Sequence, residues 1–109
     1  SIQNSSIHQL LEALWAQGAK VQLHDPEALD EIDKFYGHRN DLTLYRDQYQ
    51  AVIDADALCL LTAWKQYWSP DFSVLKNTMQ CALILDGRNI YDPEFVKAQG
   101  FEYQGVGRV

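Results

Sequence analysis

The chain has little basic charge, few cysteines and no long apolar run. Nine lysines and arginines stand against fifteen acidic residues among 109, which gives a net charge of −6, and the basic residues are scattered along the sequence. Nucleic acids and anionic membranes both bind basic surfaces. We therefore expect neither as a partner.

Segments that would direct the chain into or across a membrane are also missing. No apolar run approaches the roughly 18 to 20 residues of a membrane span, and no basic-then-apolar segment opens the chain. We therefore expect a cytoplasmic protein. Cys59 and Cys81 each lie within an apolar run, so we expect both to be small core residues, with a disulfide or a reactive thiol as the alternatives.

Common catalytic and phosphate-binding patterns are absent. There is neither a glycine-rich dinucleotide fingerprint nor a Walker-type loop. His8, His24 and His38 lie far apart and lack the spacing of metal ligands. The chain alone therefore predicts no enzyme, no metal site and no cofactor of its own.

What the sequence does contain is an alternation of short apolar runs with amphipathic segments. Its length and its 47% hydrophobic content fit a single domain, residues 1–109, with a loose N-terminal segment at 1–6. The alternation predicts an α/β fold with a doubly wound parallel sheet of about five strands. We expect strands near 21–23, 42–45, 57–61, 81–85 and 101–104. Helices are expected near 7–17, 25–36, 47–54, 70–79 and 93–98.

Two of the expected strands are wholly apolar and end in polar residues. The run 81–85 stops at Asp86-Gly87-Arg88-Asn89, and the run 57–61 stops shortly before Trp64. Continuous apolar runs predict strands buried on both faces, and ligands of open α/β sheets bind at the carboxyl ends of strands. These strand ends therefore hold the candidate site residues.

Arg88 is the best-placed candidate for binding an anion. It lies in a short connection before a helix that starts at Asp92-Pro93, and its planar guanidinium suits a phosphate or the carbonyl edge of a base. Each charged hydrogen bond contributes roughly 1.5 to 3 kcal/mol when desolvated. The alternative is that Arg88 pairs with Asp86 or Asp92.

Two other features have both a structural and a functional interpretation. Asp25 either caps a helix or meets a ribose at the end of a strand. The aromatic segment 64–72 either closes the core as a lid of rings or forms a stacking platform for a base or a sugar.

Several motifs, in this order, resemble one known family. The segments concerned are His24-Asp25-Pro26-Glu27-Ala28, Thr62-Ala63-Trp64, Ser69-Pro70-Asp71-Phe72, Asp86-Gly87-Arg88-Asn89 and 100–108. Together, over about residues 7–108, they are similar to the C-terminal, UDP-binding domain of the UDP-glucose/GDP-mannose dehydrogenases, most like the UDP-glucose members.

The resemblance implies a Rossmann-like domain that binds UDP or a UDP-sugar weakly. Arg88 would contact the nucleotide, with Asp86, Gly87, Asn89 and Trp64 as the other binding residues. Whole members oxidise a nucleotide sugar with two NAD and a cysteine thiolate, and this chain lacks the corresponding NAD domain and cysteine. It is therefore expected to be non-catalytic and to bind no cofactor.

The family's domain begins with a central strand that carries a substrate-binding lysine, and residues 1–6 replace that strand. We expect either a contracted five-stranded sheet, with 21–23 paired to 57–61, or a homodimer across the gap. Ala63 and Trp68 also depart from the family pattern. The alternative function is a self-association module that keeps the fold without the ligand, which exposure of Tyr67 and Trp68 would favour.

Overall fold

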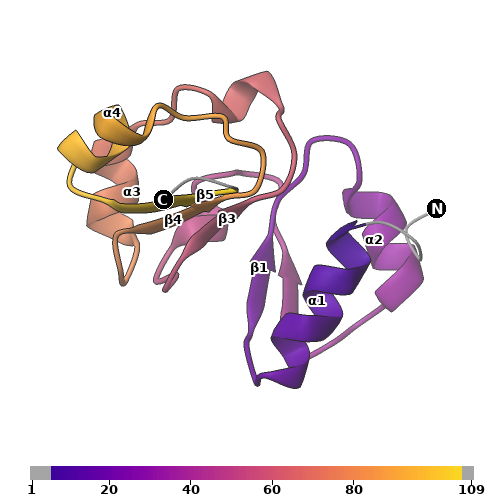
Figure 1. Cartoon of the computed structure of the whole chain (residues 1–109). Coiled ribbons are helices and arrows are strands. Elements are labelled where there is room, and N and C mark those ends of the chain that lie inside the picture. Colours follow the sequence, from indigo (N-terminus) through magenta and orange to yellow (C-terminus); the bar gives the residue numbers. More distant parts are fainter. Residues whose placement is uncertain (1–5, 107–109) are drawn as a thin grey trace. The chain divides into compact units, whose positions relative to one another are not determined.

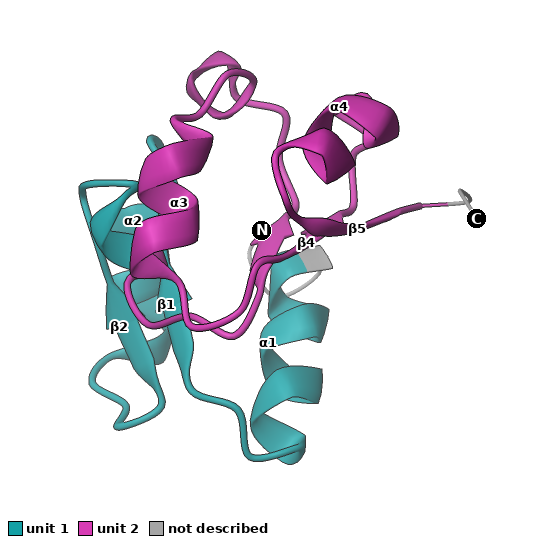
Figure 2. Ribbon diagram, turned by 90° about the vertical axis from the view of Figure 1, so that its left-hand side faces the viewer, with its two compact units in different colours: residues 1–51 teal, residues 52–109 magenta. Residues whose placement is uncertain are grey.

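The chain folds into two compact units. Residues 6–106 are described in a computed structural model, and close contacts within the chain divide it into residues 1–51 and residues 52–109 (Figure 2). Each unit contains parallel strands connected by helices. The binding residues that the family resemblance implies all belong to the second unit.

The first unit packs two helices on a pair of parallel strands. Helix α1 (Ser6–Ala16) precedes β1 (Val21–Leu23), and α2 (Leu29–Tyr36) connects β1 to β2 (Leu42–Leu44) (Figure 1). Amphipathic periodicity places the apolar side chains of both helices toward the strands. The buried core of this unit consists of Leu11, Leu23, Leu29, Ile32 and Leu42.

Asp25 and Gly37 shape the two ends of α2. Oδ1 of Asp25 accepts hydrogen bonds from the backbone N–H groups of Glu27 at 2.8 Å and Ala28 at 2.9 Å. Asp25 therefore caps the turn before α2 and not the helix itself, which starts later than predicted, at Leu29, with Ala28 as an N-cap that forms no side-chain hydrogen bond. Gly37 follows the last turn with a φ of 64°, a conformation that costs glycine little.

The second unit is a three-stranded parallel sheet with two crossover helices. Strands β3 (Leu58–Leu60), β4 (Leu83–Asp86) and β5 (Glu102–Gly105) pair in that order. Helix α3 (Phe72–Thr78) connects β3 to β4, and α4 (Pro93–Ala98) connects β4 to β5 (Figure 1). Because both crossovers run in the same direction across the sheet, a right-handed connection places both helices on one face.

This sheet is therefore buried on one face only. Leu60, Ile84 and Asp86 are buried on the helix-covered face. Cys59 and Leu85, which lie opposite each other across β3 and β4, are exposed on the other face. The expectation of strands buried on both faces is wrong here, because an apolar run does not reveal which face its crossover helices cover.

The two cysteines are not core residues as expected, since both are exposed. Cys59 points from β3 to the uncovered face, and Cys81 precedes β4 in a turn. Although Cys59 is exposed, the protein around its sulfur removes enough water to raise the pKa of the thiol. A raised pKa lowers the fraction of reactive thiolate at neutral pH.

Two of the expected helices differ in detail. The segment expected to be helical at 47–54 forms only a 3-10 turn, η2 (Gln50–Val52). Helix α3, expected near 70–79, starts at Phe72 and is capped by Asp71, whose Oδ1 accepts the backbone N–H of Val74 at 3.2 Å. A second 3-10 turn, η3 (Lys65–Tyr67), lies between β3 and α3.

Parallel pairing of all five described strands confirms the predicted α/β organisation. The strands form a two-stranded and a three-stranded sheet, and among the described strands β1 pairs only with β2 and β3 only with β4. The contracted sheet with β1 paired to β3 is therefore absent. With only three residues each, these strands offer few ladder hydrogen bonds for such a closure. No helix within residues 6–106 is long and apolar enough to cross a membrane.

Candidate functional site

The carboxylate of Asp86 organises the loop between β4 and α4. Asp86 is only 1% exposed. Its Oδ1 accepts the backbone N–H of Arg88 at 3.1 Å, and its Oδ2 accepts the backbone N–H of Tyr91 at 3.0 Å and the hydroxyl of Tyr103 at 2.8 Å. A buried carboxylate is costly without such donors. Asp86 therefore holds the loop together, and its oxygens point toward protein groups.

Gly87 and Asn89 shape the same loop. The N–H of Gly87 donates to the carbonyl oxygen of Leu60 at 2.8 Å, and a Cβ at this position would lie 2.8 Å from that oxygen. Asn89 adopts a φ of 53°, and its side-chain amide donates to the carbonyl oxygen of Val106 at 2.9 Å. Gly87 therefore allows a close backbone approach that a Cβ would obstruct. Asn89 adopts a left-handed conformation that a small polar side chain tolerates.

Among the described residues, the exposed side chain of Arg88 has no hydrogen-bond or ion-pair partner, unlike those of Asp86 and Asn89. Only its backbone N–H bonds to Asp86. The two ion pairs found among the described residues do not involve its guanidinium. The alternative pairing of Arg88 with Asp86 or Asp92 is therefore wrong. A free guanidinium stands at the carboxyl end of β4 on a loop fixed by its neighbours.

Trp64 follows the neighbouring strand at the same edge of the sheet. It lies just after β3, which pairs in parallel with β4, and it is 37% exposed. Because the carboxyl ends of adjacent parallel strands meet at one edge, the loops of Trp64 and Arg88 border the same region. A role for either residue in nucleotide binding stays a prediction.

The aromatic segment combines a packed part with an exposed part. The ring of Phe72 packs edge-on against those of Tyr91, Phe95 and Phe101, with centroids 5.8 Å apart in each pair. Trp68, in contrast, is 51% exposed. The lid interpretation therefore fits Phe72 and Tyr91 but not Trp68.

Phe95 and Val96, the two neighbouring apolar residues of α4, differ in burial. Phe95 is 54% exposed, whereas Val96 is fully buried. On a helix of six residues, adjacent positions point about 100° apart. Only one of the two can therefore face the sheet fully.

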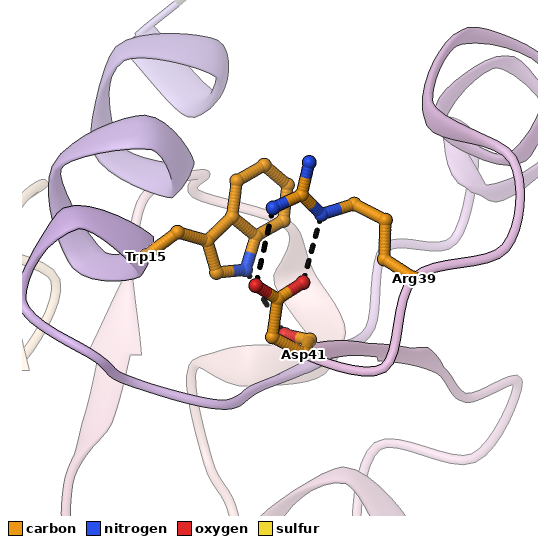
Figure 3. A network of polar contacts seen from close by, with 3 residues as sticks. All are labelled: Trp15, Arg39 and Asp41. Atoms are coloured by element: carbon orange, nitrogen blue, oxygen red, sulfur yellow. Dashed lines mark hydrogen bonds and ion pairs between the residues drawn. The ribbon is translucent and has the colours of Figure 1, made fainter.

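A polar cluster in the first unit was not predicted from the sequence. The guanidinium of Arg39 donates to both carboxylate oxygens of Asp41, from Nε at 2.7 Å and from Nη2 at 3.1 Å, and lies 3.6 Å from the centroid of the Trp15 ring (Figure 3). The indole N–H of Trp15 donates to the carbonyl oxygen of Asp41 at 3.0 Å. These contacts fasten the loop before β2 to helix α1.

Hydrogen bonding within this cluster shifts the pKa values of both ionised groups. The bond from Arg39 holds the pKa of the Asp41 carboxyl below its usual value, and the same bond raises the pKa of Arg39. Each shift reflects a charged group already paired inside the protein. The cluster is therefore a structural clamp, and the Arg-Asn-Asp spacing before a strand was the only sequence signal for it.

No set of three histidine, cysteine, aspartate or glutamate side chains in the described part of the chain is arranged to hold a metal ion.

Nδ1 of His8 lies 2.5 Å from the hydroxyl of Tyr36, and its ring stacks on the Tyr36 ring with centroids 5.9 Å apart. This histidine therefore packs one helix of the first unit on the other.

Comparison with known proteins identifies close relatives of the chain. Residues 1–93 match the family described as "UDP-glucose/GDP-mannose dehydrogenase family, UDP binding domain". UDP-glucose 6-dehydrogenase of Pseudomonas aeruginosa is 44% identical over 102 residues, which cover 91% of this chain and 22% of that protein. The Rhizobium meliloti enzyme of the same name is 38% identical over 99 residues, with the same coverage. The chain thus spans about a fifth of these relatives.

Solved structures give the same result. NDP-N-acetyl-D-galactosaminuronic acid dehydrogenase from Methanosarcina mazei Go1 matches with a TM-score of 0.75 at 26% identity, covering 94% of this chain and 20% of that one. UDP-D-ManNAc dehydrogenase from Pyrococcus horikoshii matches in fold, with a TM-score of 0.57 at 20% identity over 94% of this chain and 30% of that one. The Rossmann-like α/β fold is confirmed. The chain belongs to the UDP-glucose/GDP-mannose dehydrogenase family, and the matching part of that family is its UDP-binding domain.

Proposed function

We propose that this chain binds UDP or a UDP-sugar weakly through the guanidinium of Arg88. The observation that carries the proposal is the division of roles in the loop after β4. Asp86 and Asn89 use their side chains to fix the backbone, while Arg88 keeps its donors available. In a family whose domain is described as UDP-binding, a free guanidinium at the carboxyl end of the sheet is the natural contact for the nucleotide.

The chemistry of the guanidinium fits a nucleotide diphosphate. Its planar fork donates two parallel hydrogen bonds to phosphate oxygens or to a carbonyl edge. Because the loop is already ordered by three hydrogen bonds that the Asp86 carboxylate accepts, one of them from Tyr103, less conformational freedom is lost on binding. Trp64, at the same edge, supplies an aromatic surface for the base or ribose.

We further propose that the chain is not catalytic and binds no NAD. A dinucleotide needs a glycine-rich turn between a strand and a helix so that the pyrophosphate can approach the backbone. The connection at 24–28 has no glycine, and Gly87 in the later connection is packed against the carbonyl of Leu60. The residues present therefore do not fit NAD. Cys59, with its raised thiol pKa, is unsuited to act as a thiolate.

Calorimetric titration with UDP tests the binding proposal. We expect saturable binding by the native chain and about tenfold or greater weakening in Arg88→Ala, because loss of one charged hydrogen bond costs about 1.5 to 3 kcal/mol. Arg46→Ala is the matched control, since Arg46 forms an exposed ion pair with Asp30 in the first unit. Absence of binding at millimolar UDP, or equal affinity in Arg88→Ala, would remove the proposal.

A second candidate function is self-association, which the exposure of Trp68 favours. The strand edges are a further possible contact in a homodimer, since β1 and β3 each pair with a single described strand. Sedimentation equilibrium separates this function from nucleotide binding. A mass that rises with concentration in the native chain but not in Trp68→Ala supports association through the aromatic surface. The cytoplasmic location and the lack of a nucleic-acid partner stay predictions.

A further inference from the structure

An aromatic groove opens in the second unit beside the first turns of α3 and α4. Its volume is about 220 Å³, and four of its eight lining residues are aromatic: Trp68, Phe72, Tyr91 and Phe95. Among the lining residues in the described part of the chain, Asp92 is the one acidic residue, and none is a lysine, arginine or histidine. Arg88 does not line the groove, although Ile90 and Tyr91 of the same loop do.

The polar atoms of the rings already have partners. The indole N–H of Trp68 donates to the carbonyl oxygen of Ala63 at 3.0 Å, and the hydroxyl of Tyr91 donates to the carbonyl oxygen of Tyr67. These bonds hold two rings in place although Trp68 is half exposed. What the rings offer a ligand is therefore their apolar and π-electron surface.

The carboxylate of Asp92 gives the groove its charge preference. Asp92 is exposed at the start of α4 without a side-chain hydrogen bond to the helix, and the ion pairs of the described residues do not include it. A phosphate or carboxylate ligand would meet this negative charge with no basic side chain to offset it. A cation would find both the carboxylate and the negative faces of the rings favourable.

We propose that this groove binds a small organic ammonium cation, with Trp68 and Phe95 contacting its alkyl groups and Asp92 neutralising its charge. The volume is below the roughly 300 to 1,000 Å³ of sites for drug-sized ligands, which suits a group of a few heavy atoms. A sugar would need several hydrogen-bond partners, whereas Asp92 and the hydroxyl of Ser69 are the polar side chains available. A quaternary ammonium group needs no hydrogen-bond partner.

Calorimetric titration with choline chloride tests this proposal, with 3,3-dimethylbutan-1-ol as the neutral molecule of the same shape and with ionic strength held constant. We expect saturable millimolar binding of choline and at least about fivefold weaker binding of the neutral alcohol, because the charge supplies the cation–π and carboxylate attraction. Equal binding of the two molecules would overturn the proposal, as would failure of choline to saturate in the millimolar range.

Variants locate the binding and separate it from the nucleotide site. Trp68→Ala and Asp92→Asn should each weaken choline binding by about fivefold or more, whereas Glu94→Gln, which removes the same charge from the same helix turn outside the groove, should leave it unchanged. The Asp92 side chain forms no hydrogen bond or ion pair with the described residues, so Asp92→Asn tests the site without removing a structural contact. Unchanged choline affinity in Asp92→Asn contradicts the proposal. Arg88→Ala should lose UDP and keep choline, so failure of one site is distinguishable from failure of the other.

Discussion

Asp86 determines where Arg88 stands, although its own carboxylate is hidden from solvent. Its two oxygens accept hydrogen bonds from the backbone of Arg88 and Tyr91 and from the hydroxyl of Tyr103. The loop is thus built around a buried negative charge that three donors stabilise. The guanidinium that follows is presented by this arrangement rather than by contacts of its own.

We predict that Asp86→Asn destabilises the chain by about 2 to 3 kcal/mol, because an amide nitrogen would face N–H donors that now bond to a carboxylate oxygen. The free energy of unfolding in urea measures this loss. Glu102→Gln, an exposed acid on β5, is the control and should change stability little. A stability of Asp86→Asn equal to that of the native chain would show that the buried carboxylate is not the organiser of the loop.

The sequence predicted that Asp86, Gly87, Arg88 and Asn89 belong to one site. It did not predict which of these side chains would face a ligand and which would bond to their own loop. A polar group after an apolar strand indicates a strand end. Whether its oxygens face a ligand or the amides of its own loop depends on where the following backbone turns, which the residue types do not show. The positive φ of Asn89 and the close approach at Gly87 are the details that decide it.

The junction of β3 with β4 depends on one close backbone approach. The carbonyl oxygen of Leu60 accepts the N–H of Gly87 at 2.8 Å. A side chain at position 87 would meet the same oxygen, and backbone cannot give way as a flexible side chain can. The pairing of these two strands at their carboxyl ends therefore requires glycine.

We predict that Gly87→Ala destabilises the second unit by about 1 to 3 kcal/mol, the usual cost of forcing an extra methyl group into a packed site. It should also weaken UDP binding, because the loop that carries Arg88 would shift. Urea unfolding and UDP titration of the same variant measure both effects. Gly18→Ala provides a comparison in which only the backbone is strained, since Gly18 has a φ of 82° and nothing lies within 4 Å of an added Cβ there. Native-like stability and affinity in Gly87→Ala would contradict the predicted close packing.

In the first unit, the clamp between Arg39 and Asp41 ties stability to pH. The pKa of Asp41 is lowered in the folded chain by the hydrogen bond from Arg39. The contribution of the Asp41 carboxylate to the free energy of unfolding is therefore fully present above its unfolded pKa of about 3.9. That contribution is lost as the pH falls through the lower pKa of the folded chain. Because both side chains are partly exposed, solvent screens the pair.

We predict that Asp41→Asn shows a smaller loss of stability than the native chain when the pH is lowered from about 5 to about 2.5, since the variant has no carboxylate to protonate at this position. Urea midpoints across this range measure the difference. Asp30→Asn removes the acid of an exposed ion pair and should retain the native pH dependence. If both variants respond to acid as the native chain does, Asp41 is not linked to folding.

At the level of the whole molecule, alternation of apolar runs with amphipathic segments was sufficient to predict parallel strands connected by helices. The division into a two-stranded and a three-stranded sheet was not predictable. The division depends on which short strands form hydrogen-bonded pairs with each other. A strand of three residues has too short a pattern to predict its pairing. The exposure of Cys59 and Leu85 follows from the helices lying on one face, which is a property of topology and not of residue type.

The central claim is that one guanidinium, held on a loop fixed by Asp86, contacts the nucleotide. The most direct measurement is a titration of the native chain with UDP, followed by the side-chain Nε–H signal of Arg88 and the backbone amide signals of residues 87–91 in two-dimensional NMR spectra. We expect these signals to shift together and to saturate with a single affinity. Saturable shifts confined to other parts of the chain, with the signals of Arg88 and its loop unchanged, would contradict it.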